Sequence, residues 1–144
     1  MGHALPKARN VILVAEEDAD TTRLLRSILR RANARIVATR SGARALTIAA
    51  DNPIDLVILG VKFADIRGTT LLRRLRAINA DVPVLIATSH GSADTVREAM
   101  ELGVVDYLTK PFDRGEMLAA VQAALAARAR LSAGADDADV TALP

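Results

Sequence analysis

Five short runs of apolar residues recur along the chain, and most of them are apolar throughout rather than alternating with polar residues. Each run is rich in Val, Ile and Leu, the residues that suit buried β-strands. Strands without alternation are typical of parallel sheets that are covered on both faces. The runs lie at residues 11–15, 35–39, 54–60, 82–88 and 104–109.

The segments between these runs have apolar residues at helical spacing. In residues 18–32, the side chains of Leu24, Leu25, Ile28 and Leu29 fall on one face, and arginines take the other positions. Helices are therefore predicted over residues 18–32, 41–52, 68–80, 92–103 and 113–131, with Leu71, Leu72, Leu75 and Ile78 on the apolar face of the third and Ser92 as the cap of the fourth.

This alternation of strands and helices predicts a doubly wound α/β fold of (βα)₅ type, with a parallel sheet and right-handed crossovers. Ligands of such sheets bind at the carboxyl ends of the strands. We expect residues 1–9 to be an N-terminal extension and residues 10–131 to form the domain. Residues 132–144 have no apolar period and predict a flexible tail or the beginning of a linker.

Composition excludes several classes of protein. The 144 residues suit one domain, and the lack of cysteine excludes disulfides and thiolate metal sites. No segment approaches the roughly 20 apolar residues of a membrane span, so we expect a soluble, cytoplasmic protein without membrane contact. The net charge of +2 is small and mixed along the chain, which argues against a nucleic-acid surface. The aromatic residues, which single-stranded nucleic acid would need for stacking, are Phe63, Tyr107 and Phe112.

Polar residues follow four of the predicted strands where each strand ends. Glu16 and Glu17 follow the first, Gly60 and Lys62 the third, Thr88 and Ser89 the fourth, and Lys110 the fifth. Because the carboxyl ends of parallel strands meet at one edge, we expect these residues to line a single crevice.

Four ordered motifs around these positions, "ILVAEED", "DLVILGVKFADIRG", "VPVLIATS" and "DYLTKPF", together resemble the receiver domain of two-component response regulators. The resemblance covers residues 10–130 and implies the sheet order 2-1-3-4-5. It also implies a site in which an acidic pair binds Mg²⁺ and an aspartate after the third strand accepts a phosphoryl group. On this resemblance the acidic pair is Glu16 and Glu17, the hydroxyl that binds phosphoryl oxygens is Thr88, the lysine is Lys110, the aromatic switch is Tyr107, and the phosphoacceptor position falls on Gly60.

Glycine at this position removes the reaction that the resemblance implies. A phosphoacceptor needs a nucleophilic oxygen, and Mg²⁺ needs oxygen ligands in octahedral geometry; Gly60 supplies neither from a side chain. Both acidic residues are one methylene longer than the family's aspartates, and Ala64 replaces the usual loop proline. We therefore expect no cofactor, with Glu16, Glu17 and the backbone of Lys62 as weak candidate ligands if Mg²⁺ binds.

Other readings of these residues are open. Glu17 is long enough to reach Lys110 and neutralise it, which we favour over Mg²⁺ binding because an unpaired buried charge is costly. Thr88 either keeps a switch role or bonds to backbone or water. Tyr107 is either a switch or a half-buried strand residue with a solvated hydroxyl. His90 is expected to be exposed, and a lone histidine predicts no metal site.

Asp65 is the alternative phosphoacceptor, but a solvated loop aspartate that helps to start the next helix is favoured because nothing positions it as a nucleophile. Asp55 begins the third strand, at the opposite end of the sheet.

Three functions compete. The first is a pseudo-receiver, not an enzyme, that signals by phosphorylation-independent protein contact. The second is an ordinary phosphorelay receiver whose Gly60 is an engineered substitution or whose acceptor has moved. The third, a flavodoxin-like enzyme or ligand binder, is disfavoured because "AEEDAD" after the first strand would repel an anion.

The resemblance places the contact face, for a protein partner or a second copy, in residues 92–130, which include Arg97, Glu98, Met100, Tyr107 and Arg114. Nucleic acid is expected only through an output domain outside this sequence.

Overall fold

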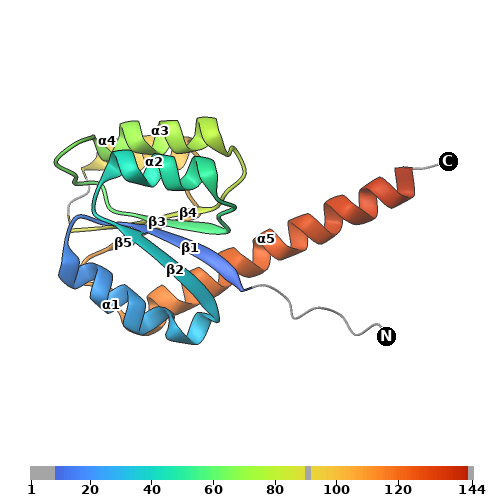
Figure 1. Cartoon of the computed structure of the whole chain (residues 1–144), viewed down its shortest axis with the longest axis horizontal. Helices are drawn as coiled ribbons and strands as arrows, with labels where there is room; N and C mark the ends of the chain where they lie inside the picture. The colour runs from blue at the N-terminus through green and yellow to red at the C-terminus, as the bar shows by residue number, and fades with distance from the viewer. Residues whose placement is uncertain (1–8, 90–91, 143–144) are drawn as a thin grey trace.

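The computed structural model describes residues 9–89 and 92–142, with side chains as far as residue 130. Five parallel strands form one sheet in the order β2-β1-β3-β4-β5 (Figure 1), which confirms the predicted order. The strands are β1 (Asn10–Ala15), β2 (Ala34–Thr39), β3 (Leu56–Leu59), β4 (Val84–Thr88) and β5 (Asp106–Thr109). The expectation for His90 lies outside the described residues.

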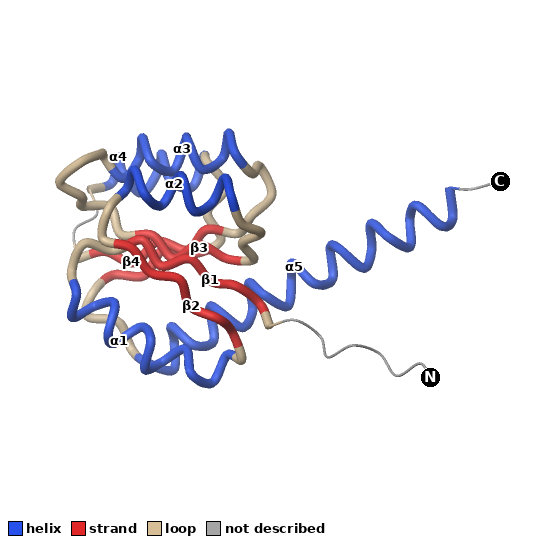
Figure 2. Tube along the Cα trace, viewed as in Figure 1, coloured by secondary structure: helices blue, strands red, loops and turns tan. Residues whose placement is uncertain are grey.

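Helices cover both faces of the sheet, as Figures 1 and 2 show, with α1 and α5 on one face and α2, α3 and α4 on the other. A 3₁₀ turn, η1, extends α1 toward β2. The helical elements are α1 (Ala19–Leu29), η1 (Arg30–Ala32), α2 (Gly42–Asp51), α3 (Gly68–Ile78), α4 (Ala93–Glu101) and α5 (Arg114–Ala142). Within the described residues, no helix is both long enough and apolar enough to span a membrane.

The uninterrupted apolar runs arise because each central strand is buried on both faces. In β3, Leu56 and Ile58 belong to the core under α1 and α5, whereas Val57 and Leu59 belong to the core under α2, α3 and α4. All four are buried. The strand therefore delivers its next residue, Gly60, to the middle of the edge where the strands end.

Two predicted core residues of the helices are exposed instead. Leu24 is 37% exposed and Ile78 is 42% exposed. Leu24 lies about 100° around the helix from Leu25, at the edge of the buried stripe, and Ile78 is the last residue of α3. The predicted cap of α4 is confirmed, because the Ser92 hydroxyl accepts a hydrogen bond from the backbone N–H of Thr95.

Helix α5 is longer than the sequence predicted. The backbone stays helical to Ala142 and its C-terminal part projects from the body of the domain (Figure 1), whereas we expected the helix to end near residue 131. Alanines through this segment favour continuation of a helix that is already formed. The role of residues 132–144 as a linker stays a prediction.

Candidate functional site

The carboxyl ends of the strands surround a pocket of about 440 Å³. Its lining includes Glu16, Glu17, Gly60, Thr88 and Lys110, together with Lys62 and Ser89. The structure thus brings together the positions that the strand order predicts at one edge. Tyr107 is not part of the lining.

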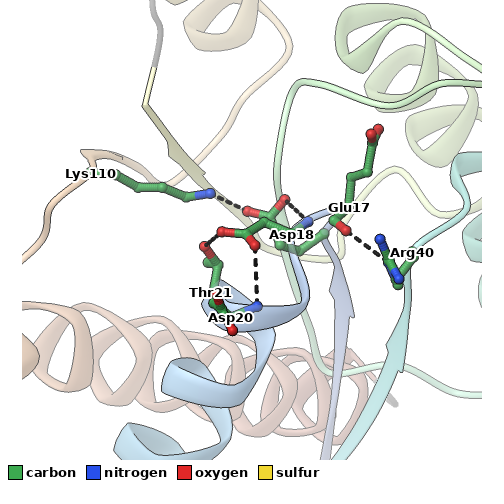
Figure 3. A network of polar contacts seen from close by, with 7 residues as sticks. Glu17, Asp18, Asp20, Thr21, Arg40 and Lys110 are labelled. Atoms are coloured by element: carbon green, nitrogen blue, oxygen red, sulfur yellow. Dashed lines mark hydrogen bonds and ion pairs between the residues drawn. The ribbon is translucent and has the colours of Figure 1, made fainter.

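Two residues of the pocket lining, Lys110 and Glu16, form an ion pair. The Lys110 Nζ donates a hydrogen bond to Glu16 Oε1 (Figure 3). Both side chains are largely withdrawn from solvent, with 20% of Lys110 and 7% of Glu16 exposed. The other carboxylate oxygen of Glu16 accepts a bond from the backbone N–H of Asp18 at 3.3 Å. Both oxygens of this carboxylate are therefore engaged.

The predicted partner of Lys110 was Glu17, and this was wrong. The chain is still extended where β1 ends, since the Glu16 N–H bonds to the carbonyl of Thr39 at 3.0 Å. Successive side chains of an extended chain point to opposite sides, so Glu17 turns away from Lys110 (Figure 3). Its Oε2 is buried and has no hydrogen-bond partner among the described residues.

Gly60 lies directly beside the Glu16 carboxylate. Its backbone N–H donates to the carbonyl of Ala15 at 2.9 Å, which holds the end of β3 against the end of β1. A Cβ at position 60 would lie 2.8 Å from Glu16 Oε2. The carboxylate of Glu16 therefore occupies the space into which a side chain at position 60 would grow.

Asp18 and Arg40 also line the pocket. The Asp18 carboxylate accepts hydrogen bonds from the Thr21 hydroxyl at 2.8 Å and the Asp20 N–H at 3.2 Å, so it caps α1. The Thr21 hydroxyl and the Asp20 N–H lower the pKa of this carboxyl. Sequence reasoning missed Arg40, whose Nε donates to the Glu17 carbonyl at 2.8 Å (Figure 3). Its position directly after β2 was the available signal.

Mg²⁺ needs several free oxygens in an octahedral shell. In this pocket Glu16 is held by Lys110, Asp18 caps a helix, and Gly60 has no side chain, which leaves the Oε2 atom of Glu17 as the carboxylate oxygen without a hydrogen-bond partner among the described residues. Among the side chains that the structure describes, those of residues 9–89 and 92–130, no group of three or more acidic, histidine or cysteine residues is placed to hold a metal ion.

Thr88 and Tyr107 lie on the neighbouring strands β4 and β5, with Thr88 in the lining of the pocket and Tyr107 outside it. Thr88 is buried at the end of β4, where its register partner is Thr109 of β5. Tyr107 pairs in register with Ile86 and packs into the core under α2, α3 and α4. Its hydroxyl is buried without a hydrogen-bond partner among the described residues, which contradicts the reading with a solvated hydroxyl. Burial raises the pKa of Tyr107.

The alternative acceptor, Asp65, caps the N-terminus of helix α2. Its carboxylate accepts bonds from the Ser41 hydroxyl and the backbone N–H groups of Gly42 and Ala43. It therefore caps the helix before it in sequence, not the next helix as predicted. These donors, with the Ala43 N–H first, lower its pKa.

Asp55 lies at the opposite end of the sheet, as predicted. It accepts a bond from the Val11 N–H at 2.8 Å and pairs with Arg128 at 3.4 Å.

The order of the sheet and the pocket at its carboxyl edge define the class of protein. Residues 12–122 match the family described as the response regulator receiver domain, and the chain belongs to this family of two-component signalling domains.

The chain is also similar to particular proteins of this kind. It is 35% identical over 115 residues to the transcriptional regulatory protein ZraR of Escherichia coli K12, which covers 80% of this chain and 26% of that protein. It is 33% identical over 117 residues to the transcriptional regulatory protein PrrA of Mycobacterium tuberculosis, covering 81% of this chain and 50% of that protein. The chain thus spans about a quarter to a half of these relatives.

Solved structures agree on the fold. A receiver domain from Clostridium thermocellum, 27% identical, has a TM-score of 0.78 over 85% of this chain and 98% of that chain. A CheY-like receiver domain from Methanospirillum hungatei, 17% identical, has a TM-score of 0.82 with the same coverage of each chain.

Proposed function

We propose that this receiver domain signals through protein contacts without being phosphorylated. The observation that carries the proposal is that Lys110 pairs with the carboxylate of Glu16, at the end of β1, while position 60 has no side chain. A phosphoacceptor needs a carboxylate oxygen that is free to attack. The two oxygens of Glu16 accept hydrogen bonds from Lys110 and from the backbone N–H of Asp18, and these bonds disfavour their attack on a phosphodonor.

The test is incubation with a small acyl phosphate and Mg²⁺, followed by intact mass measurement. We expect no adduct on this chain, while a receiver domain with an aspartate after its third strand gains about 80 Da, the mass of one phosphoryl group on a carboxylate. A stable adduct on the wild-type chain would overturn the proposal. Mapping that adduct to Asp65 would support the alternative of a moved acceptor, which the capping role of Asp65 does not favour.

We place the contact surface within residues 92–130, for a protein partner or a second copy of the chain. Met100 of α4 and Val105 before β5 support this placement, because they are 56% and 50% exposed. Exposed apolar side chains on a folded domain are candidates for interface anchors. Met100→Glu should abolish self-association, or the capture of partner proteins, while a charge reversal on α2 at the exposed Arg44 should not.

The remaining parts of the function are proposed from the relatives. ZraR and PrrA are named transcriptional regulatory proteins, and this chain spans at most half of their length. We propose that contact with nucleic acid belongs to a part outside residues 1–144, and that the domain acts in the cytoplasm without Mg²⁺. Loss of function in the full protein when Mg²⁺ is removed would contradict the proposal that the domain acts without this ion.

A further inference from the structure

Gly60 is required for space and not for its backbone conformation. Among the described glycines only Gly103 has a positive φ, so the backbone at position 60 is one that other residues adopt. The three atoms nearest to a Cβ at this position are Oε2, Cδ and Oε1 of Glu16, at 2.8, 3.2 and 3.3 Å. All three contacts are with the end of one side chain, so a Cβ at position 60 requires this carboxylate to shift, and its hydrogen bonds with Lys110 and Asp18 oppose that shift.

The strand register explains why this carboxylate reaches position 60. β1 and β3 are neighbours, and Ala15 lies opposite Leu59. Glu16 and Gly60 are thus the next residues along two adjacent strands. The second methylene of glutamate extends its carboxylate across the gap, where Lys110 and the N–H of Asp18 hold it.

We propose that Glu16 and Gly60 are one coupled unit, in which the Glu16 carboxylate takes the place of a side chain at position 60 and permanently neutralises Lys110. Lys110 needs a charge partner because its side chain is only 20% exposed. Glu16 supplies that partner from within the chain, so Lys110 stays engaged whether or not a phosphodonor is present. The inference rests on the proposed function and deepens it, since Glu16 becomes the residue that positions Lys110.

The coupling predicts that a substitution at position 60 alone destabilises the domain. In Gly60→Asp a second carboxylate meets that of Glu16 at a distance where both steric overlap and like-charge repulsion oppose it. In Glu16→Asp the carboxylate withdraws by one methylene and weakens its hold on Lys110. Together, the two substitutions make room at position 60 and return a carboxylate to Lys110.

The experiment is a double-mutant cycle by urea unfolding of the whole chain. We expect Gly60→Asp alone to lower the unfolding midpoint by about 1 M, and Glu16→Asp in the same chain to restore most of it. The expected coupling is about tenfold in the unfolding equilibrium constant. The matched control is Glu17→Asp with Gly60→Asp, which shortens the neighbouring glutamate and should restore nothing, because Glu17 turns away from Lys110.

A milder cycle keeps the test decisive if Gly60→Asp does not fold. Gly60→Ala adds only the Cβ that meets Glu16, and it should destabilise the wild-type chain but have little effect in a Glu16→Ala background. The inference is overturned if, in whichever cycle folds, the effects of the two single substitutions add to within about twofold in the unfolding equilibrium constant. Rescue of Gly60→Asp by Glu17→Asp would also overturn it. Its failure is separate from that of the proposed function, which depends on a mass adduct of the wild-type chain and not on the cycle.

Discussion

The carboxylate of Asp65 accepts a hydrogen bond from the hydroxyl of Ser41 at 2.9 Å, although 24 positions separate the two residues in sequence. The same carboxylate receives the first N–H groups of α2, from Gly42 and Ala43. Helix N-termini leave such donors without partners inside the helix, and a negative charge there is favoured by the helix dipole. The loop between β3 and α3 is thereby fastened to α2.

Asp65→Asn should lower the thermal midpoint by roughly 2–5 °C at neutral pH. The N–H donors lower the pKa of Asp65 below its usual value, so the ionised carboxyl is favoured in the fold. Its contribution is present above the unfolded pKa near 4 and is lost as the pH falls through the lower folded pKa. Melting curves of both proteins from neutral to acid pH should therefore converge in acid. A constant difference across this range would show that charge is not involved.

Tyr107→Phe should stabilise the domain by about 1 kcal/mol, because it removes a buried hydroxyl that lacks a hydrogen-bond partner in the described chain. The raised pKa of Tyr107 means that the unfolded state loses the phenolic proton first. Ionisation of Tyr107 therefore leaves the free energy of unfolding of the wild type unchanged below a pH of about 10 and lowers it as the pH rises through the folded pKa. The Phe variant lacks this part of the pH dependence. Urea unfolding at neutral and alkaline pH measures both effects. A less stable Phe variant would mean that the hydroxyl has a partner.

Arg76→Met should destabilise the domain by about 2–4 kcal/mol. The guanidinium of Arg76 donates to the carbonyl groups of Leu102, Val82 and Gly103, and so joins α3 to two loops at the amino ends of β4 and β5. Burial lowers the pKa of this guanidinium, yet the carbonyl groups replace the lost water. Arg74→Met, at an exposed position of the same helix, is the matched control and should change stability by less than about 0.5 kcal/mol. Equal effects of the two substitutions would contradict the role of Arg76.

Mg²⁺ should leave the thermal midpoint unchanged within about 1 °C when compared with a salt of matched ionic strength. A specific site filled at a hundredfold excess over its dissociation constant would add about 2.7 kcal/mol to the stability of the fold. We expect no such gain because Glu16 is engaged with Lys110 and Gly60 carries no oxygen on a side chain. Differential scanning calorimetry with and without the ion makes the comparison. A concentration-dependent rise specific to Mg²⁺ would place the ion in the pocket.

The sequence predicted the parallel alternation of strands and helices and the composition of the pocket because both follow from simple periodic rules, whereas the order of the strands was implied by the resemblance to receiver domains. Fully apolar runs mark buried parallel strands, and parallel strands gather the residues that follow them at one edge. These rules do not determine whether Glu16 or Glu17 pairs with Lys110. The pairing depends on which of two adjacent glutamates points inward, and that is set by how far β1 stays extended past Ala15.

The role of Asp65 was equally hidden, because its partners belong to the preceding helix and not to the following one. Contacts of this kind depend on the path of a loop in space, which local propensities do not determine. The end of α5 at Ala142 was misjudged for a different reason: Gly and Asp in residues 132–139 are poor helix formers, but they do not stop a helix as proline does.

The contact between Glu16 and position 60 also limits how this sequence can change over time. While Glu16 is present, an aspartate at position 60 meets its carboxylate, and while Gly60 is present, a shorter residue 16 loosens Lys110. On the proposed coupling, each of these single substitutions gives a less stable protein. Selection on folding alone would then preserve Glu16 and Gly60 together, so we expect the two positions to change as a pair.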